Sequence, residues 1–151
     1  MVATVRPESI WFDTHLAVNP KDKKNNYLAQ QDKRVTNPLN DNTEMHFISD
    51  DFVDPEFGSG IVKLSPALDR NDYDAVSRHK EIPIIEVLEW DGSGKMSSTS
   101  PYVGISVSAA RKQAVEDLQN RNAIEKVEEG YLHSVPQCKA GHQIEPLIIP
   151  N

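Results

Sequence analysis

The apolar residues of this chain fall into short runs, and proline, glycine, asparagine or aspartate closes almost every one of them. Runs of this length between turn-forming residues are typical of β-strands and not of long helices. No apolar run reaches the roughly 18 residues that a membrane-spanning helix needs. The pattern therefore predicts many short strands, with helices only where the spacing of apolar residues changes.

Several segments match the strand pattern, and a polar, turn-rich stretch from Lys21 to Glu44 separates the second from the third. We interpret that stretch as a surface excursion with a short helix or strand inside it. The predicted strands lie at Ala3–Val5, His15–Pro20, from Met45 onward, Gly60–Pro66, Ile82–Trp90, Ala123–Pro136 and Gln143–Ile149.

Two segments favour helices. The first is the short stretch 71–80, with Asn71 as its expected N-cap. The second begins near Ser108, where Ala110, Ala114 and Leu118 recur at helical spacing. Interspersed strands and helices predict a mixed α/β fold with a β-barrel-like core and flanking helices. A length of 151 residues suits one domain, and the abrupt ends lead us to expect a domain, residues 1–151, cut from a larger protein.

The composition excludes several classes of function. A net charge of −7 is a poor basis for holding nucleic acid by its phosphates alone. A single cysteine, Cys138, excludes an internal disulfide and a cysteine-based zinc site, and it favours a reducing compartment. The first residues lack the pattern of a signal peptide, so we expect a cytoplasmic protein.

Common catalytic motifs are weak here. The five histidines show no metal-ligand spacing, and no G-x-S-x-G motif occurs. Cys138 with His133 or His142 could form a nucleophilic pair, but a loop cysteine without a catalytic role is the favoured interpretation. The segment 95–98, Lys-Met-Ser-Ser, matches an ATP-binding signature of class I aminoacyl-tRNA synthetases. Its partner motif is missing, and we interpret it as a coincidence in a polar loop.

The stretch from Gly60 to Tyr73, GIVKLSPALDRNDY, concentrates polar groups at a strand end. Asp69 and Asp72 share one face if a helix begins near Arg70, beside Lys63 and Ser65. The two aspartates would then either satisfy the amides at the helix N-terminus or bind an ammonium group of a ligand. The residues alone leave these alternatives balanced.

A resemblance to a known family covers nearly the whole chain. The blocks VATVRPES, DTHLAVNP, DPEFGSGIVKLSPALDRNDY, ARKQAVEDL and HSVPQC resemble, in order, the editing domains of valyl-tRNA synthetases. The central family block reads approximately D-P-x-F-G-T-G-A-V-K-[IV]-T-P-A-H-D-x-N-D-Y. The lysine before Ser-Pro, together with ARKQAVEDL and HSVP, favours the valyl member over the isoleucyl and leucyl relatives.

This resemblance implies an aminoacyl-tRNA deacylase domain that hydrolyses the ester of misacylated tRNA(Val), chiefly threonyl-tRNA(Val). Threonine is nearly isosteric with valine, and a hydrophobic pocket rejects an added hydroxyl by only about 10²-fold. The ligase activity, with its ATP and Mg, would belong to the parent enzyme's catalytic core. Two alternatives stay open: an editing domain of an isoleucyl- or leucyl-tRNA synthetase, and a non-catalytic module that binds the 3′ end of aminoacyl-tRNA.

The resemblance also implies roles for particular residues. Asp69 would hold the substrate's α-ammonium group, and Asp72 would accept a hydrogen bond from the threonine hydroxyl. The implied catalytic residues are Asp69, Lys63 and Thr4, and the implied substrate-binding residues are Arg6, Phe57, Ser65 and Asp72. No metal and no cofactor are expected in the domain. The implied partners are the 3′ end of misacylated tRNA(Val) and the parent's catalytic core, with neither DNA nor membrane.

The chain departs from the family pattern at a few positions. Leu68 stands where the family has histidine, which removes a polar contact or proton carrier. Ser65 replaces a threonine and keeps the hydroxyl, and Val5 replaces a frequent second threonine. Near the C-terminus only Cys138 remains of a frequent Cys-x-x-Cys pair, which argues against zinc there.

Overall fold

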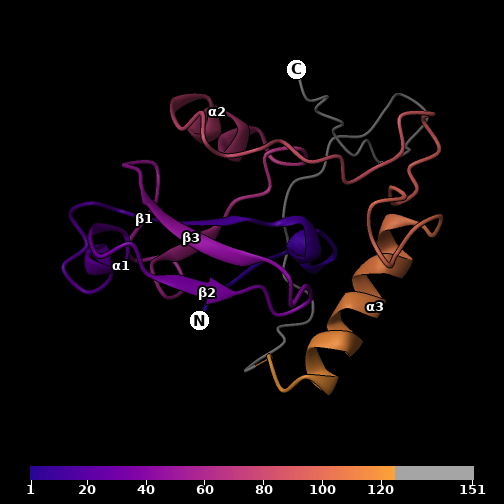
Figure 1. The fold of residues 1–151 in the computed structure, drawn as a ribbon, viewed down its shortest axis with the longest axis horizontal. Coiled ribbons are helices and arrows are strands. Elements are labelled where there is room, and N and C mark those ends of the chain that lie inside the picture. The colour runs from indigo at the N-terminus through magenta and orange to yellow at the C-terminus, as the bar shows by residue number, and fades with distance from the viewer. Residues whose placement is uncertain (125–151) are drawn as a thin grey trace.

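The fold is seen in a computed structural model, which describes residues 1–124. A short 3₁₀ helix opens the structure, and a four-stranded sheet with three α-helices follows (Figure 1). The elements in chain order are η1 (Pro7–Phe12), β1 (His15–Val18), α1 (Asn26–Gln30), β2 (Arg34–Thr36), β3 (Glu44–Ser49), β4 (Ile61–Lys63), α2 (Arg70–Arg78) and α3 (Val107–Asn120).

The sheet has the strand order β2-β3-β1-β4. β1 pairs in parallel with β3 and antiparallel with β4, and the register sets Leu16 opposite Phe47 on one side and opposite Lys63 on the other. The start of β1 and the end of β4 therefore meet at one end of the sheet, along the strand direction. The ends of β1 and β3 lie at the opposite end.

Alternating side chains of β1 give the sheet two apolar faces. Leu16 and Val18 pack with Met45 and Phe47 on the face that Leu28 of α1 partly covers. Ala17 points the other way and joins a second cluster, in which Val76 brings α2 onto the sheet. Helix α2 thus packs on this face of the sheet and lies above the strands in the view of Figure 1, and the position of its two ends depends on this packing.

A third apolar cluster joins α3 to η1. Ala110, Ala114 and Leu118 form a stripe at four-residue spacing that packs against a group including Phe12 and Leu68. An ion pair adds to this contact: the Arg111 guanidinium donates 3.0 and 2.8 Å hydrogen bonds to both carboxylate oxygens of the fully buried Glu8. Apolar packing and an ion pair therefore both join η1 to α3.

The predicted mixed α/β class is confirmed, and in residues 1–124 its β-structure is an open four-stranded sheet. The strands expected after His15, near Met45 and after Gly60 are present. The polar stretch 21–44 contains both a short helix and a short strand. The predicted strands that begin beyond Ala123 fall almost wholly outside the described residues.

Two strand predictions were wrong. Ala3–Val5 forms no strand, because the Thr4 hydroxyl accepts the Arg6 N–H at 3.0 Å and Pro7 then begins η1. The segment 82–90 forms only one isolated bridge, between Leu88 and Met96. Its apolar residues pack against the core, so the pattern predicted burial correctly but not a pairing partner.

Both predicted N-caps were displaced by two residues. Asp69, not Asn71, caps α2, and Ser106, not Ser108, caps α3. In the Lys-Met-Ser-Ser segment Lys95 and Ser98 are exposed, whereas Met96 is fully buried and Ser97 is nearly so. Within the described part of the chain, no helix is long and apolar enough to cross a membrane.

Candidate functional site

A buried polar network lies where the start of β1 meets the end of β4. The Lys63 ammonium group lies 2.9 Å from an Asp13 oxygen, 2.6 Å from the Ser9 hydroxyl and 2.5 Å from the Ser65 hydroxyl. Ser65 also donates to the second Asp13 oxygen at 2.8 Å and lies 2.9 Å from Ser9. Two segments that are distant in sequence, 9–13 and 63–65, thus share one polar cluster.

This buried network does not contain a serine nucleophile. A lysine beside a serine hydroxyl is a known nucleophilic arrangement, but the Ser65 side chain is only 4% exposed and Ser9 is fully buried. The Lys63 and Asp13 side chains are 9% and 2% exposed. No substrate carbonyl reaches oxygens at that depth, so the network's role is to hold surrounding groups in place.

Burial raises the pKa of Asp13, while the Lys63 charge and hydrogen bonds from Lys63 and Ser65 oppose the increase. An ammonium group has three N–H donors, and three oxygens surround Lys63. Removing one partner of a buried ion pair leaves an uncompensated charge, which is strongly destabilising. Asp13 and Lys63 therefore depend on each other.

Asp72 connects the network to the surface. Its Oδ2 accepts the Ser65 backbone N–H at 2.8 Å, and no residue in 1–124 donates to its Oδ1. Burial raises the pKa of Asp72 to about 7; the hydrogen bond from Ser65 and the Lys63 charge lower it, and the charges of Asp69 and Asp13 raise it further. Asp72 is therefore a carboxyl group with one anchored oxygen and a charge that is costly to maintain.

Asp69 has one of the two roles that the sequence left open, the capping of α2, and its geometry leaves room for the other. Its Oδ1 accepts the backbone N–H groups of Asn71 at 2.8 Å and Asp72 at 3.1 Å, which makes it the N-cap of α2. Among residues 1–124 nothing donates to its Oδ2, and the side chain is half-buried. Capping thus uses one oxygen and leaves the other able to accept a ligand's ammonium hydrogen.

Thr4 and Arg6 approach the network indirectly. The Arg6 carbonyl accepts the Ser9 hydroxyl at 2.9 Å, and the Thr4 hydroxyl accepts the Arg6 N–H. The segment before η1 therefore lies one hydrogen bond away from Lys63 and Ser65, through Ser9. In residues 1–124 no hydrogen bond joins Thr4 or Arg6 to the two aspartates.

Phe57 lies in the turn before β4 and is 47% exposed. A Cβ atom on the next residue, Gly58, would lie 3.2 Å from the Ala3 side chain, and the Ser59 hydroxyl bonds the Met1 carbonyl. The turn that carries Phe57 is therefore placed against the segment that carries Thr4. In the part of the chain the structure describes, no hydrogen bond or ring contact links Phe57 to the polar network.

Leu68 points away from the polar groups. Its side chain is 2% exposed and belongs to the core cluster of η1 and α3, although its neighbour Asp69 caps α2 at the surface. The residue that replaces the family histidine thus contributes to packing in this chain.

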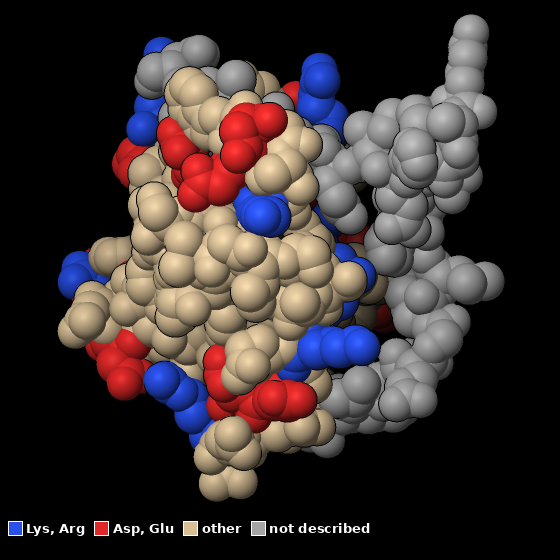
Figure 2. Space-filling view, turned by 90° about the vertical axis from the view of Figure 1, so that its right-hand side faces the viewer, with Lys and Arg blue, Asp and Glu red and all other residues tan. Residues whose placement is uncertain are grey.

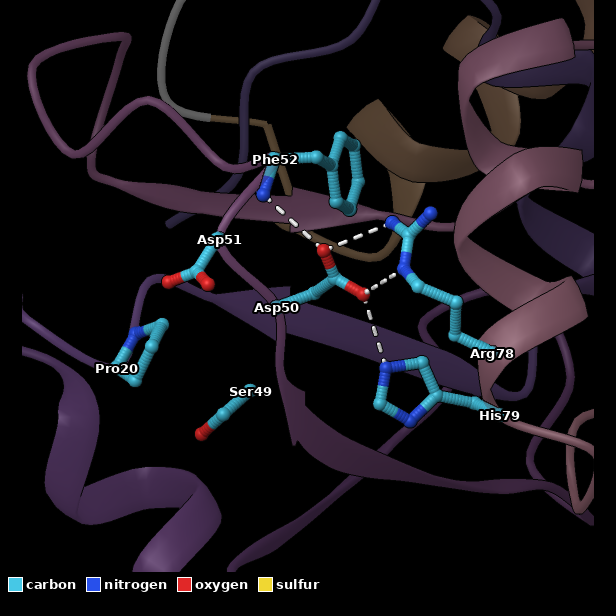
Figure 3. A pocket seen from close by; sticks show the side chains of 7 residues that line it. All are labelled: Pro20, Ser49, Asp50, Asp51, Phe52, Arg78 and His79. Carbon is cyan, nitrogen blue, oxygen red and sulfur yellow. Dashed lines mark hydrogen bonds and ion pairs between the residues drawn. The ribbon is translucent and has the colours of Figure 1, made fainter.

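A second polar cluster lies at the opposite end of the strands, where β3 ends (Figure 3). Asp50 accepts two hydrogen bonds from Arg78 at 2.9 and 3.1 Å, the Phe52 N–H at 3.1 Å, and faces a His79 ring nitrogen at 3.0 Å. Burial opposes ionisation of Asp50, but these bonds outweigh it and its pKa lies below the ordinary value. An open pocket that Phe52 and Asp51 help to line surrounds this cluster.

Sequence reasoning identified Lys63, Ser65, Asp69 and Asp72 but missed Ser9 and Asp13. Both missed residues stand inside blocks that carried the resemblance, in VATVRPES and DTHLAVNP. Neither carried a strong local signal, since Ser9 lies within η1 and Asp13 stands two residues before β1. No group of three or more histidine, cysteine, aspartate or glutamate side chains in residues 1–124 has metal-binding geometry, and Cys138, His133 and His142 lie outside the described residues.

Comparison with known proteins finds relatives along almost the whole chain. The valine–tRNA ligase of Synechocystis is 41% identical over 149 residues, that of Coxiella burnetii 39% over 149 residues, and that of Geobacillus stearothermophilus 40% over 148 residues. These alignments cover 97–98% of this chain but only 16% of each relative. No family model matches the chain.

A solved structure resembles the fold. The Agrobacterium radiobacter K84 LeuRS, solved as a ternary complex with tRNA and LeuAMS, matches 78% of this chain and 16% of its own, with a TM-score of 0.56 and 20% identity. At that identity the likeness concerns the fold alone. The two comparisons together confirm the resemblance to this group of synthetases, and they relate the chain to one segment of a much longer enzyme.

Proposed function

This chain is homologous to one segment of the valine–tRNA ligases, and from that premise we propose that it is the editing domain of such an enzyme. Its reaction is hydrolysis of the ester that joins a wrong amino acid to the 3′-terminal ribose of tRNA(Val). The observation that carries the proposal is the pair Asp69 and Asp72, each with one oxygen held by backbone amides and the other without a donor in residues 1–124.

The two aspartates have different roles in this proposal. The half-buried Asp69 binds the α-ammonium group, because a charge-assisted hydrogen bond is strong in a partly desolvated place. Asp72 accepts a hydrogen bond from the threonine side-chain hydroxyl. Valine has no such donor and would leave the buried acceptor unpaired, which disfavours its binding by the full desolvation cost. Threonine is therefore the preferred amino acid.

The remaining residues frame the site. Lys63 and Ser65 form the wall behind Asp72, and Thr4 and Arg6 approach it through Ser9. Phe57 supplies an exposed aromatic ring from the turn that lies against Ala3, the neighbour of Thr4 in sequence. In the proposed reaction a positioned water attacks the ester without a covalent intermediate, and the residues contribute orientation and electrostatic stabilisation. No cofactor or metal takes part.

The charge of the chain limits how it binds tRNA. Acidic and basic side chains alternate at the rim of the face in Figure 2, and the described residues in the middle of that view are uncharged. With a net charge of −7, the domain is suited to the aminoacylated 3′ end, while the parent's catalytic core holds the tRNA body. We therefore propose a weak affinity for tRNA in isolation and a cytoplasmic location with the translation machinery.

The direct test is deacylation by the 151-residue chain at high concentration. Threonyl-tRNA(Val) should be hydrolysed faster than in buffer, and valyl-tRNA(Val) much more slowly. Asp69→Ala should abolish the activity, whereas Asp74→Ala, on an exposed position of the same helix, is the matched control and should retain it. A folded chain that accelerates nothing would refute the catalytic proposal and favour a module that only binds the 3′ end.

The order of substrates separates the remaining alternatives. Preference for a misacylated tRNA(Ile) or tRNA(Leu) over threonyl-tRNA(Val) would assign the domain to an isoleucyl or leucyl enzyme. Activity that survives Asp69→Ala would show that the site lies elsewhere.

A further inference from the structure

The link between the buried network and Asp72 runs through a single residue. The Ser65 side chain is held by Lys63, Asp13 and Ser9, while its backbone N–H is the one donor to Asp72 within residues 1–124. The contacts that hold the Ser65 side chain therefore help to fix the residue whose backbone amide anchors Asp72. The network and the first turn of α2 form one continuous chain of contacts.

The Lys63 ammonium group is fully occupied within this chain of contacts. Three oxygens surround it, at 2.5, 2.6 and 2.9 Å, and 9% of the side chain is exposed. A group in that state does not exchange its partners for a substrate at low cost, because a buried ammonium must stay hydrogen-bonded. Lys63 thus acts on the site through Ser65 and not by touching the ester.

We propose that Asp13 is a positioning residue for the reaction, which acts together with Ser9 through Lys63 and Ser65 to fix Asp72 at the start of α2. The Asp13 carboxylate compensates the charge of the buried Lys63 ammonium group. One of its oxygens accepts a hydrogen bond from Lys63 and the other accepts one from Ser65. The role of Asp13 in hydrolysis rests on the proposed editing function. The coupling of Asp13 to Asp72 does not depend on that function.

Two readouts on the 151-residue chain test the coupling. The first is carbon-13 NMR titration of the Asp72 carboxyl group in the wild type and in Asp13→Asn. Charged groups that face Asp72 are Asp69 at its own helix end, Lys63 from β4 and Asp13 from the segment before β1. Removing the Asp13 charge leaves the Lys63 charge unopposed, so the Asp72 titration midpoint should move to lower pH. Asp51→Asn, at an exposed position beyond the opposite end of the strands, should leave the Asp72 titration midpoint unchanged.

The second readout is deacylation of threonyl-tRNA(Val). Asp13→Asn should lower kcat/KM by about 10- to 100-fold, the size expected when a reacting geometry shifts slightly. A residue with a merely structural role would lower stability and leave the titration of Asp72 in the folded molecules unmoved. An unmoved titration midpoint in folded Asp13→Asn overturns the proposal. If the wild type hydrolyses no ester but the midpoint still moves, the editing function fails and the coupling stands.

Ser9 keeps the proposal testable if Asp13→Asn does not fold. Ser9→Ala removes one hydroxyl between Lys63, Ser65 and the Arg6 carbonyl, and Ser9→Thr keeps it. Deacylation should fall about tenfold or more in Ser9→Ala and stay within a few-fold of wild type in Ser9→Thr. Equal rates in Ser9→Ala and wild type, with both folded, would contradict the proposed chain of contacts.

Discussion

Helix α2 is anchored to the sheet by carboxylates at both of its ends, and the two anchors differ in kind. At the C-terminal end Asp50 accepts from Arg78 and the Phe52 N–H and faces His79, and its pKa is lowered. At the N-terminal end Asp72 accepts one backbone N–H, and burial raises its pKa to about 7. A carboxylate whose hydrogen-bonding capacity is filled stabilises a fold, whereas one with spare capacity can bind a ligand.

The two ends of this nine-residue helix also differ in whether their polar groups could bind a ligand. The Asp50 end lies beside an open pocket (Figure 3), yet its polar groups already bind one another. The Asp72 end retains two carboxylate oxygens that nothing in residues 1–124 occupies. The open pocket beside Asp50 is therefore not the better candidate for the site.

The largest effect on stability is expected at the filled anchor. Asp50→Ala removes a buried carboxylate and leaves Arg78 and His79 without their shared partner. We expect a loss of about 2–3 kcal/mol in the free energy of unfolding. This is less than for a fully buried ion pair, because the Arg78 side chain is half exposed. Urea denaturation measures it, with Asp51→Ala as the exposed neighbouring control. Equal midpoints for Asp50→Ala and Asp51→Ala would contradict the distinction between the two helix ends.

Substitution of Asp72, in contrast, is expected to raise the free energy of unfolding. Its folded pKa of about 7 lies above the ordinary pKa of an aspartate, so its protonated form contributes stability that is fully present below that ordinary pKa and lost as pH rises through 7. Asp72→Asn cannot ionise and avoids this loss. Relative to wild type, the variant should gain on the order of 2 kcal/mol more stability at pH 8 than at pH 5. Urea denaturation at both pH values checks this, and a gain that is independent of pH would contradict the raised pKa.

A smaller effect on stability distinguishes the two roles of Asp69. Asparagine is an equally good N-cap, while alanine is not, so Asp69→Ala should cost about 1 kcal/mol and Asp69→Asn almost nothing. Both variants remove the negative charge that would bind the α-ammonium group, and both should lose deacylation. Thermal unfolding and the deacylation assay together measure this. Full activity in Asp69→Asn would mean that Asp69 is only a cap.

The sequence predicted local structure where the signal is local. The apolar runs of β1, β3 and β4 and the spacing of Ala110, Ala114 and Leu118 all correspond to elements of the fold. The segment 82–90 had an equally apolar pattern but found no strand partner, because pairing depends on which segments the fold brings alongside. Propensity does not carry that information.

The candidate site shows the same limit. Asp69 and Asp72 were identified because they stand a few residues apart in one recognisable block. Asp13 and Ser9 were missed because they meet Lys63 only through the register of β1 with β4, across 50 and 54 residues of sequence. The predicted caps were displaced because several polar residues precede each helix, and only the backbone conformation decides which of them accepts the first amides.

The most direct test of the central claim, that the N-terminal end of α2 recognises threonine, is the ratio of kcat/KM for threonyl-tRNA(Val) to that for valyl-tRNA(Val) in wild type and Asp72→Asn. The asparagine amide oxygen can still accept the Ser65 N–H, which turns its NH₂ group, a donor, toward the position of the threonine hydroxyl. We predict that the ratio falls by about 10- to 100-fold, which corresponds to the loss of one hydrogen bond to a charged group. An unchanged ratio in a folded Asp72→Asn chain would contradict the account.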